Sequence, residues 1–146
     1  MSLSVEHSII VGLREPRNEP ELTRVLAAIF ASDPALAGQF VKTVLAHSKR
    51  PNDSRWPELP SRFDCRSEVY IGQGDRVDLE FTDPASAWRV LVELKIDAGY
   101  GFDQIKRYLC CLDRADKRQV LVSITRDEPK YGDPALDGRP QWCGSV

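Results

Sequence analysis

Three charged residues stand inside apolar segments in the middle of the chain. Asp78 lies within Val77-Asp78-Leu79, and Glu93 and Lys95 lie within the run from Leu91 to Ile96. An unpaired charge is costly to bury, so a neutral side chain would be the simpler choice at these positions. The three residues therefore mark a candidate site for acid–base or metal chemistry.

Strand geometry can bring these charges together. Side chains alternate across a β-strand, so Glu93 and Lys95 would share one face. The fourteen residues between Asp78 and Glu93 are enough for two strands and a turn that place the carboxylates side by side. Glu68, on a neighbouring strand, would add a third carboxylate. The sequence thus predicts a cluster of three carboxylates and one lysine.

Such a cluster favours a bound cation. Two like charges about 4 Å apart repel by roughly 4 kcal/mol at an effective dielectric constant of about 20. Oxygen ligands with open positions for water are typical of Mg²⁺ or Mn²⁺, which can lower the pKa of a bound water. Lys95 could then orient an attacking hydroxide or stabilise the transition state.

A simpler interpretation of the same residues remains open. A Glu-x-Lys pattern on a strand is also what a solvated face with a cross-strand ion pair looks like. By the same reasoning, Glu68 could be an edge-strand charge. Glu21 is best explained as a helix-capping residue.

Two amphipathic helices are expected in the first third of the chain. Asn18-Glu19-Pro20-Glu21 has the pattern of a helix start, with Asn18 as the N-cap and Pro20 in the first turn. A second helix is expected to begin at Asp33-Pro34. The residues expected on the buried faces are Leu22, Val25, Leu26, Ile29 and Phe30, then Leu36, Phe40, Val41, Val44 and Leu45.

A change to strand periodicity follows a proline-rich loop. An antiparallel meander is expected from three strands, a helix follows, and a further strand would run parallel to the third one. Three turn signals come after Thr125, and nothing there is expected to close the fold. The expected strands are Ser67 to Ile71, Arg76 to Phe81, Arg89 to Ile96 and Gln119 to Thr125, and the expected helix is Asp103 to Leu112.

The arrangement of these residues resembles the PD-(D/E)XK nuclease superfamily. Its core motif is an acidic residue on one strand followed by Glu-x-Lys on the next, which Asp78 and Glu93-Leu94-Lys95 match. The segment from Gln104 to Tyr108 is similar to the family's Q-x-x-x-Y helix. The resemblance covers most of the chain, from about Glu19 to Thr125, and includes the order of the elements.

The resemblance implies a fold and an activity. The fold would be α/β, with the three-layer, restriction-endonuclease-like arrangement of a mixed central sheet flanked by helices. The activity would be metal-dependent endonucleolytic hydrolysis of DNA, with RNA the less favoured substrate. Asp78, Glu93 and the main-chain carbonyl of Leu94 would hold Mg²⁺ or Mn²⁺, with Glu68 as a further candidate ligand, and Lys95 would position the water.

The resemblance also suggests supporting residues. Gln104 and Tyr108 would lie near the active site or touch the substrate backbone, although helix surface and core packing would also explain them. Some branches carry a glutamate at the start of the first helix, which makes Glu19 an accessory candidate. The pattern there is Glu-Asn-x-x-Thr, whereas this chain has proline in the asparagine position.

A basic loop between the helices and the strands is a candidate nucleic-acid contact. Base stacking on Trp56 with phosphate contacts from nearby cations would suit a nucleic acid, and a solvated connector is the alternative interpretation. The basic residues concerned are Lys49, Arg50, Arg55 and Arg62.

Length and composition set the remaining expectations. The chain has 146 residues, 42% of them hydrophobic and 29% charged, with a net charge of −2. These values indicate one globular domain spanning 1–146 and exclude nucleic-acid binding through bulk charge alone. The four cysteines form no CxxC pair, and no targeting or membrane-spanning pattern is seen, so a cytoplasmic protein with reduced thiols is expected.

The wider context is also an expectation. Related nuclease domains often belong to longer proteins, including bacterial defence systems, so this domain is expected to be the N-terminal part of a longer protein with a regulatory domain. A homodimer or higher oligomer is compatible with double-strand cleavage. Two alternatives are a catalytically inactive module that binds nucleic acid or a protein partner, and a domain that binds a phosphorylated small ligand.

Overall fold

Five strands form one mixed β-sheet. The computed structural model describes residues 19–72, 74–95, 102–125 and 138–146, and the side chains of all of these except 19, 20, 102 and 103. The strands lie in sequence order across the sheet. They are β1 (Asp64–Ile71), β2 (Asp75–Asp83), β3 (Trp88–Lys95), β4 (Gln119–Thr125) and β5 (Trp142–Ser145).

The strand directions confirm the predicted meander and the parallel fourth strand. The pairs β1–β2 and β2–β3 are antiparallel, and β4 runs parallel to β3. The hairpin between β1 and β2 turns with positive φ at Gly72 and Gly74, a conformation that glycine adopts without a steric penalty. The end of the predicted third strand, Ile96, lies outside the described residues.

The prediction that nothing after Thr125 closes the fold is wrong. The strand β5 pairs in parallel with β4, and the amide of Leu121 donates to the carbonyl of Gln141 at 2.7 Å. Trp142 and Cys143 are buried. Four residues are too few to show the alternation that identifies a strand in a sequence, and most of the predicted turn signals lie outside the described residues.

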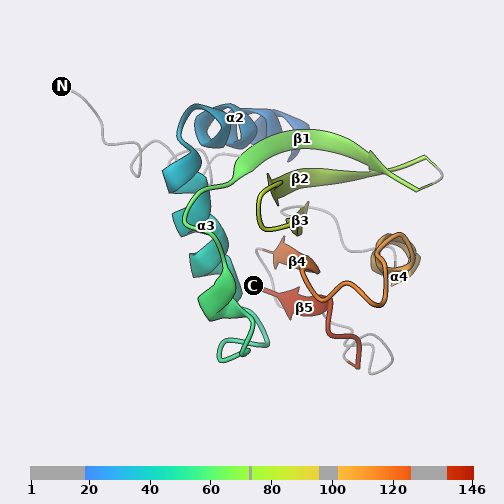
Figure 1. Ribbon diagram of the computed structural model, residues 1–146. Helices are drawn as coiled ribbons and strands as arrows, with labels where there is room; N and C mark the ends of the chain where they lie inside the picture. The colour runs from blue at the N-terminus through green and yellow to red at the C-terminus, as the bar shows by residue number, and fades with distance from the viewer. Residues whose placement is uncertain (1–18, 73, 96–101, 126–137) are drawn as a thin grey trace.

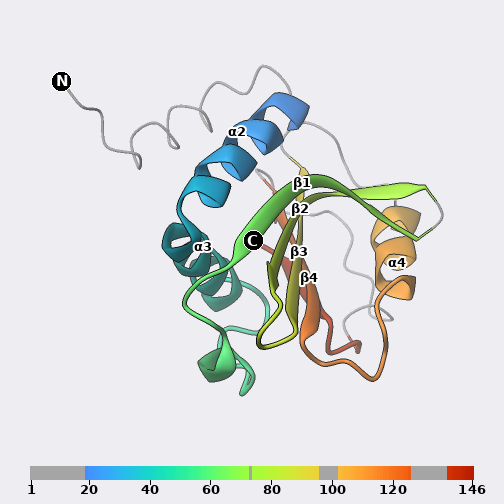
Figure 2. The ribbon, with the colours of Figure 1, turned by 45° about the horizontal axis from the view of Figure 1, so that its top comes forward.

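Helices cover both faces of the sheet, which gives three layers (Figures 1 and 2). On one face lie α2 (Glu19–Ser32) and α3 (Pro34–Ala46), and on the other lies α4 (Phe102–Cys110). Each face has its own hydrophobic core, of which Phe30 and Leu45 belong to the first and Ile105 and Leu109 to the second. The predicted α/β class with a mixed sheet and flanking helices is therefore confirmed.

The two N-terminal helices begin close to the predicted positions. Asp33 caps α3, because its Oδ1 accepts a hydrogen bond from the amide of Leu36 at 3.0 Å. Asn18, the predicted cap of α2, lies outside the described residues. Val25 was expected to be buried but is exposed, because the buried stripe of α2 runs through Leu22 and Leu26 and is displaced toward Thr23 and Ala27, away from Val25.

The cysteines and the lengths of the helices bear on two further expectations. The four cysteines are all free, and the expectation of reduced thiols in a cytoplasmic protein stays a prediction. Across the described ranges, no helix combines the length and the apolar character needed to cross a membrane.

Candidate functional site: a carboxylate pair between two strands

Asp78 and Glu93 lie side by side where β2 and β3 separate. The antiparallel ladder pairs Leu79 with Val92, and the same register would next pair Asp78 with Glu93. Side-chain bonds replace the ladder at that point. The amide of Leu94 donates to Oδ2 of Asp78 at 2.7 Å, and the amide of Asp78 donates to Oε2 of Glu93 at 3.4 Å. Each carboxylate is thus held by the backbone of the other strand.

The side chains of the β1–β2 hairpin change face part-way along it, at the point where β2 and β3 separate. Cys65 of β1 packs into the core under α2 and α3, whereas Ile71 of the same strand packs against α4. Regular alternation would place both residues on one face. The change falls at Glu68, whose φ of 51° is in the left-handed region. It also falls at the opposite position, Asp78, so the outer half of the hairpin turns toward α4.

Lys95 completes the predicted motif. Its Nζ lies 3.2 Å from Oε1 of Glu93, and both side chains are largely shielded from solvent. This contact confirms that Glu93 and Lys95 share one face of β3. It also joins the lysine to the carboxylate pair.

The electrostatic state of Glu93 is unusual for a glutamate. Burial, and secondarily the neighbouring charge of Asp78, raise the pKa of Glu93 to about 7, while Lys95 opposes the shift. Glu93 is only 2% exposed. One lysine therefore does not fully compensate two adjacent carboxylates in this environment.

Helix α4 contributes the predicted glutamine and tyrosine. The Nε2 of Gln104 donates to Oε1 of Glu93 at 2.9 Å and lies 2.7 Å from the hydroxyl of Tyr108. The Tyr108 hydroxyl in turn donates to the carbonyl of Arg76 in β2. Burial raises the pKa of Tyr108 above its usual value, so the hydroxyl stays protonated. The two residues therefore orient Glu93 and attach α4 to the hairpin.

Glu68 does not join the carboxylate pair as predicted. Its Oε2 lies 3.4 Å from Nε of Arg24 on α2, and its Oε1 lies 3.8 Å from Nη1 of Arg76. Within the described residues, no group of three or more Asp, Glu, His or Cys side chains could hold a metal ion. The side chain of Glu19 lies outside the described part of the chain.

The donor set fits a divalent cation with two carboxylate ligands. Asp78 and Glu93 present carboxylate oxygens on adjacent strands, and the main-chain carbonyl of Leu94 is the further candidate ligand. Hard cations such as Mg²⁺ take few protein ligands and keep several waters. Burial, and secondarily the charge of Asp78, raise the pKa of Glu93, and a cation bound beside it would favour its charged form.

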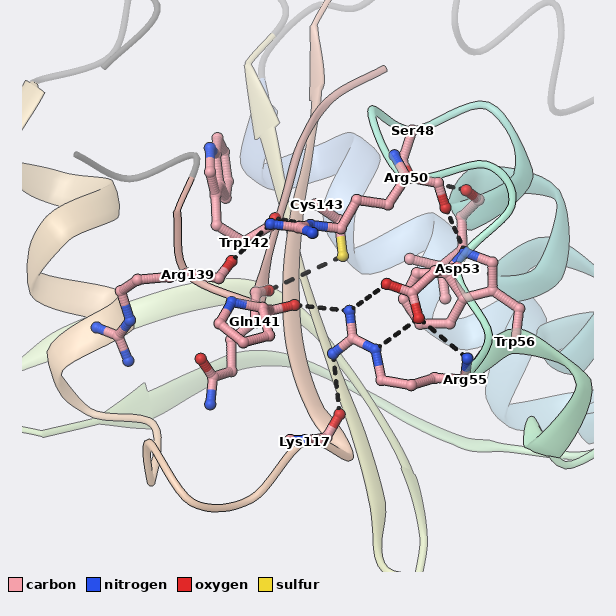
Figure 3. Close-up of polar contacts among 12 residues, drawn as sticks. Ser48, Arg50, Asp53, Arg55, Trp56, Lys117, Arg139, Gln141, Trp142 and Cys143 are labelled. Carbon is pink, nitrogen blue, oxygen red and sulfur yellow. Dashed lines mark hydrogen bonds and ion pairs between the residues drawn. The ribbon is translucent and has the colours of Figure 1, made fainter. Parts of the chain in front are cut away.

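The structure gives two of the predicted nucleic-acid-binding residues a different role. The guanidinium of Arg55 forms a bidentate pair with Asp53 at 2.8 Å and also donates to the carbonyls of Lys117 and Pro140. Arg50 donates to the carbonyls of Arg139 and Trp142. These contacts attach the loop after α3 to the C-terminal segment (Figure 3).

The other members of the basic loop are placed apart from the carboxylates. Trp56 packs against the core on the α2 and α3 side of the sheet and donates its indole N–H to the carbonyl of Arg50. Lys49 and Arg62 are exposed. The loop therefore lies on the α2 and α3 side of the sheet, whereas Glu93 faces α4.

Two polar residues near the site were missed in the sequence. Glu80 is 3% exposed and lies between Arg66 at 2.6 Å and Arg89 at 2.7 Å. Its alternation with Asp78 along β2 was a signal that could have identified it. Ser123, beside Glu93 in the β3–β4 register, is buried and its hydroxyl contacts that of Ser145. No sequence pattern marks a serine of this kind.

No family model, curated protein or solved structure matches this chain significantly.

Proposed function

We propose that the protein is a divalent-metal-dependent nuclease of the PD-(D/E)XK type that hydrolyses phosphodiester bonds in DNA. The observation that carries the proposal is the placement of two carboxylates on adjacent strands, each held by a backbone amide of the other strand, with the Lys95 ammonium 3.2 Å from Glu93. The order of helix, antiparallel meander, helix and parallel strand is compatible with the restriction-endonuclease-like fold that the motif implies.

The residues of the pair would have distinct roles in hydrolysis. Asp78, Glu93 and the carbonyl of Leu94 would hold Mg²⁺ or Mn²⁺, which supplies Lewis-acid stabilisation and lowers the pKa of a bound water. Lys95 would orient that water for attack on phosphorus and stabilise the added negative charge. The bond from phosphorus to the leaving oxygen breaks, and that oxygen takes up a proton. Gln104 fixes the orientation of Glu93.

Cleavage of supercoiled plasmid tests the proposal. We expect nicking in Mn²⁺ or Mg²⁺ that EDTA stops, and a loss of at least about 100-fold on Lys95→Ala or Glu93→Gln, the scale of removing one transition-state contact. Lys106→Ala is the matched control, because Lys106 is an exposed lysine on α4 outside the carboxylate pair. Undiminished nicking by the folded Lys95→Ala protein would overturn the assignment.

Metal binding can be measured independently of cleavage. Mn²⁺ is expected to raise the melting temperature of the wild-type protein at neutral pH, since a ligand that binds the folded state stabilises it. Asp78→Asn and Glu93→Gln should lose most of this increase, whereas Lys106→Ala should retain it. An equal increase in all four proteins would place the metal elsewhere.

A further inference from the structure

An exposed tyrosine stands on the outer half of the β1–β2 hairpin. Tyr70 is 70% exposed, although the hairpin residues around it pack well against α4. Directly opposite Tyr70 in the register is Arg76, whose guanidinium lies 5.7 Å from the centre of the tyrosine ring. The hairpin therefore presents an aromatic ring and a cation together at the surface.

A second arginine extends this surface onto α2. Arg24 and Arg76 both contact Glu68, at 3.4 and 3.8 Å, and both arginine side chains remain more than half exposed. Ion pairs with this exposure contribute little free energy, so a phosphate oxygen can replace Glu68 at small cost. Two arginines against one glutamate leave this surface with a net positive charge.

The surface is next to the carboxylate pair along the hairpin. Arg76 precedes Asp78 by two residues, and its carbonyl accepts the hydroxyl of Tyr108, the residue that contacts Gln104. Glu68 occupies the register position opposite Asp78. A DNA strand lying over Arg24 and Arg76 would thus pass within two residues of Asp78 along β2.

We propose that Arg24, Tyr70 and Arg76 form a binding site for an unpaired DNA strand beside the carboxylate pair. The proposal rests on the proposed function for the identity of the polymer. Arginines hold the phosphates, and the tyrosine ring stacks on a base. Stacking requires a base face that is free. A duplex covers the faces of its bases, so the exposed ring favours a single strand or a locally opened one.

Binding measurements test this site without cleavage. All variants are made in the Glu93→Gln protein, and fluorescence anisotropy follows a short labelled single-stranded DNA in Mg²⁺. Tyr70→Ala should weaken binding by about 5- to 150-fold, the effect of losing one stacked base. Tyr70→Phe retains the ring and should bind like the parent. Arg24→Ala and Arg76→Ala should each reduce the salt dependence of log K by about 0.7.

The controls separate this inference from the proposed function. Arg62→Ala removes an exposed arginine at a distance from the site and should leave binding unchanged. The matching duplex should bind more weakly and be insensitive to Tyr70→Ala. Parent-like binding of Tyr70→Ala to the single strand, or an equal loss on the duplex, would overturn the inference. If the wild type cleaves plasmid but Tyr70→Ala does not weaken single-strand binding, only this binding site is refuted. If Tyr70→Ala weakens binding but the wild type does not cleave, only the nuclease activity is refuted.

Discussion

Glu93 is the residue whose environment departs most from that of a solvated side chain. It contacts Lys95, Gln104 and the amide of Asp78, and burial raises its pKa to about 7. A glutamate with a raised pKa binds its proton more tightly in the folded protein than in the unfolded chain. Its ionisation therefore reduces stability progressively as the pH rises from about 4.5 to about 7.

Glu93→Gln is expected to remove this loss of stability. One pKa unit corresponds to about 1.4 kcal/mol, so the shift represents roughly 3 kcal/mol at pH 8 and almost nothing at pH 4. Part of that gain is offset because Lys95 loses a partner. Urea unfolding at both pH values in EDTA measures the effect. The variant should exceed the wild type by about 1–3 kcal/mol at pH 8 only, and a variant less stable than the wild type at pH 8 would contradict this account.

At the scale of the elements, helix α3 meets the chain that enters β1 at very short range. A Cβ on Gly38 would lie 2.0 Å from the carbonyl oxygen of Ser61, and this contact is with backbone, which cannot rotate away. The amide of Phe63 also donates to the carbonyl of Pro34 at 3.1 Å. The glycine thus permits α3 to pack directly against the segment leading into the sheet.

Gly38→Ala should destabilise the protein even though it improves helix propensity. Alanine is favoured over glycine inside a helix by about 1 kcal/mol, but the added methyl group must displace backbone, and overpacking costs about 1–3 kcal/mol or more. We expect a net loss of at least about 1 kcal/mol in the free energy of unfolding. Gly74→Ala provides a contrast in space, because a Cβ there meets nothing within 4 Å, although its φ of 88° adds backbone strain. A stabilised Gly38→Ala protein would show that α3 and the segment leading into β1 can move apart at little cost in free energy.

The face to which the side chains of the β1–β2 hairpin point also depends on the helix that packs against each half. Its inner half packs under α2 and α3, and its outer half packs against α4. The reversal at Glu68 and Asp78 is what places an acidic side chain in the space between β2 and β3. Sequence periodicity predicted both strands but not this reversal, because a change of face depends on which helix lies over each half.

At the scale of the whole molecule, partly buried arginines join the loop after α3 to the C-terminal segment. Arg55 and its partner Asp53 are each 14% exposed, and the hydrogen bond from Arg55 holds the pKa of Asp53 below its usual range. Through the carbonyl of Pro140, Arg55 also contacts the segment that leads into β5. The final strand is therefore held by β4 on one side and by the loop after α3 on the other (Figure 3).

Arg55→Lys should reduce stability although it retains the positive charge. A lysine cannot make the bidentate contact with Asp53 and also reach two carbonyls, because it lacks the planar guanidinium. Loss of a hydrogen bond to a charged group costs about 1.5–3 kcal/mol. Thermal unfolding should show the decrease, and Arg62→Lys, an exposed substitution in the same loop, should leave the melting temperature unchanged. Equal melting temperatures for the two variants would show that the guanidinium contacts of Arg55 contribute little to stability.

Local patterns in the sequence predicted most of the fold. The cap of α3, most of the apolar spacing of α2 and α3, the positions of β1 to β4 and the period of α4 are properties of neighbouring residues, so they can be read without a structure. The pairing of Asp78 with Glu93 and the shared face of Glu93 and Lys95 followed from strand geometry. The fifth strand did not, because it depends on pairing with β4, which lies outside its own segment.

The sequence by itself therefore determined which residues carry charge into the sheet and on which strands they lie. Only the tertiary structure decided which of them meet. It brought Gln104 to Glu93, directed Glu68 toward Arg24 and Arg76 instead of the carboxylate pair, and used Arg50 and Arg55 to hold the C-terminal segment. The physical reason is that a charged side chain takes the partner that packing places within reach, and that choice depends on contacts between segments distant in the sequence.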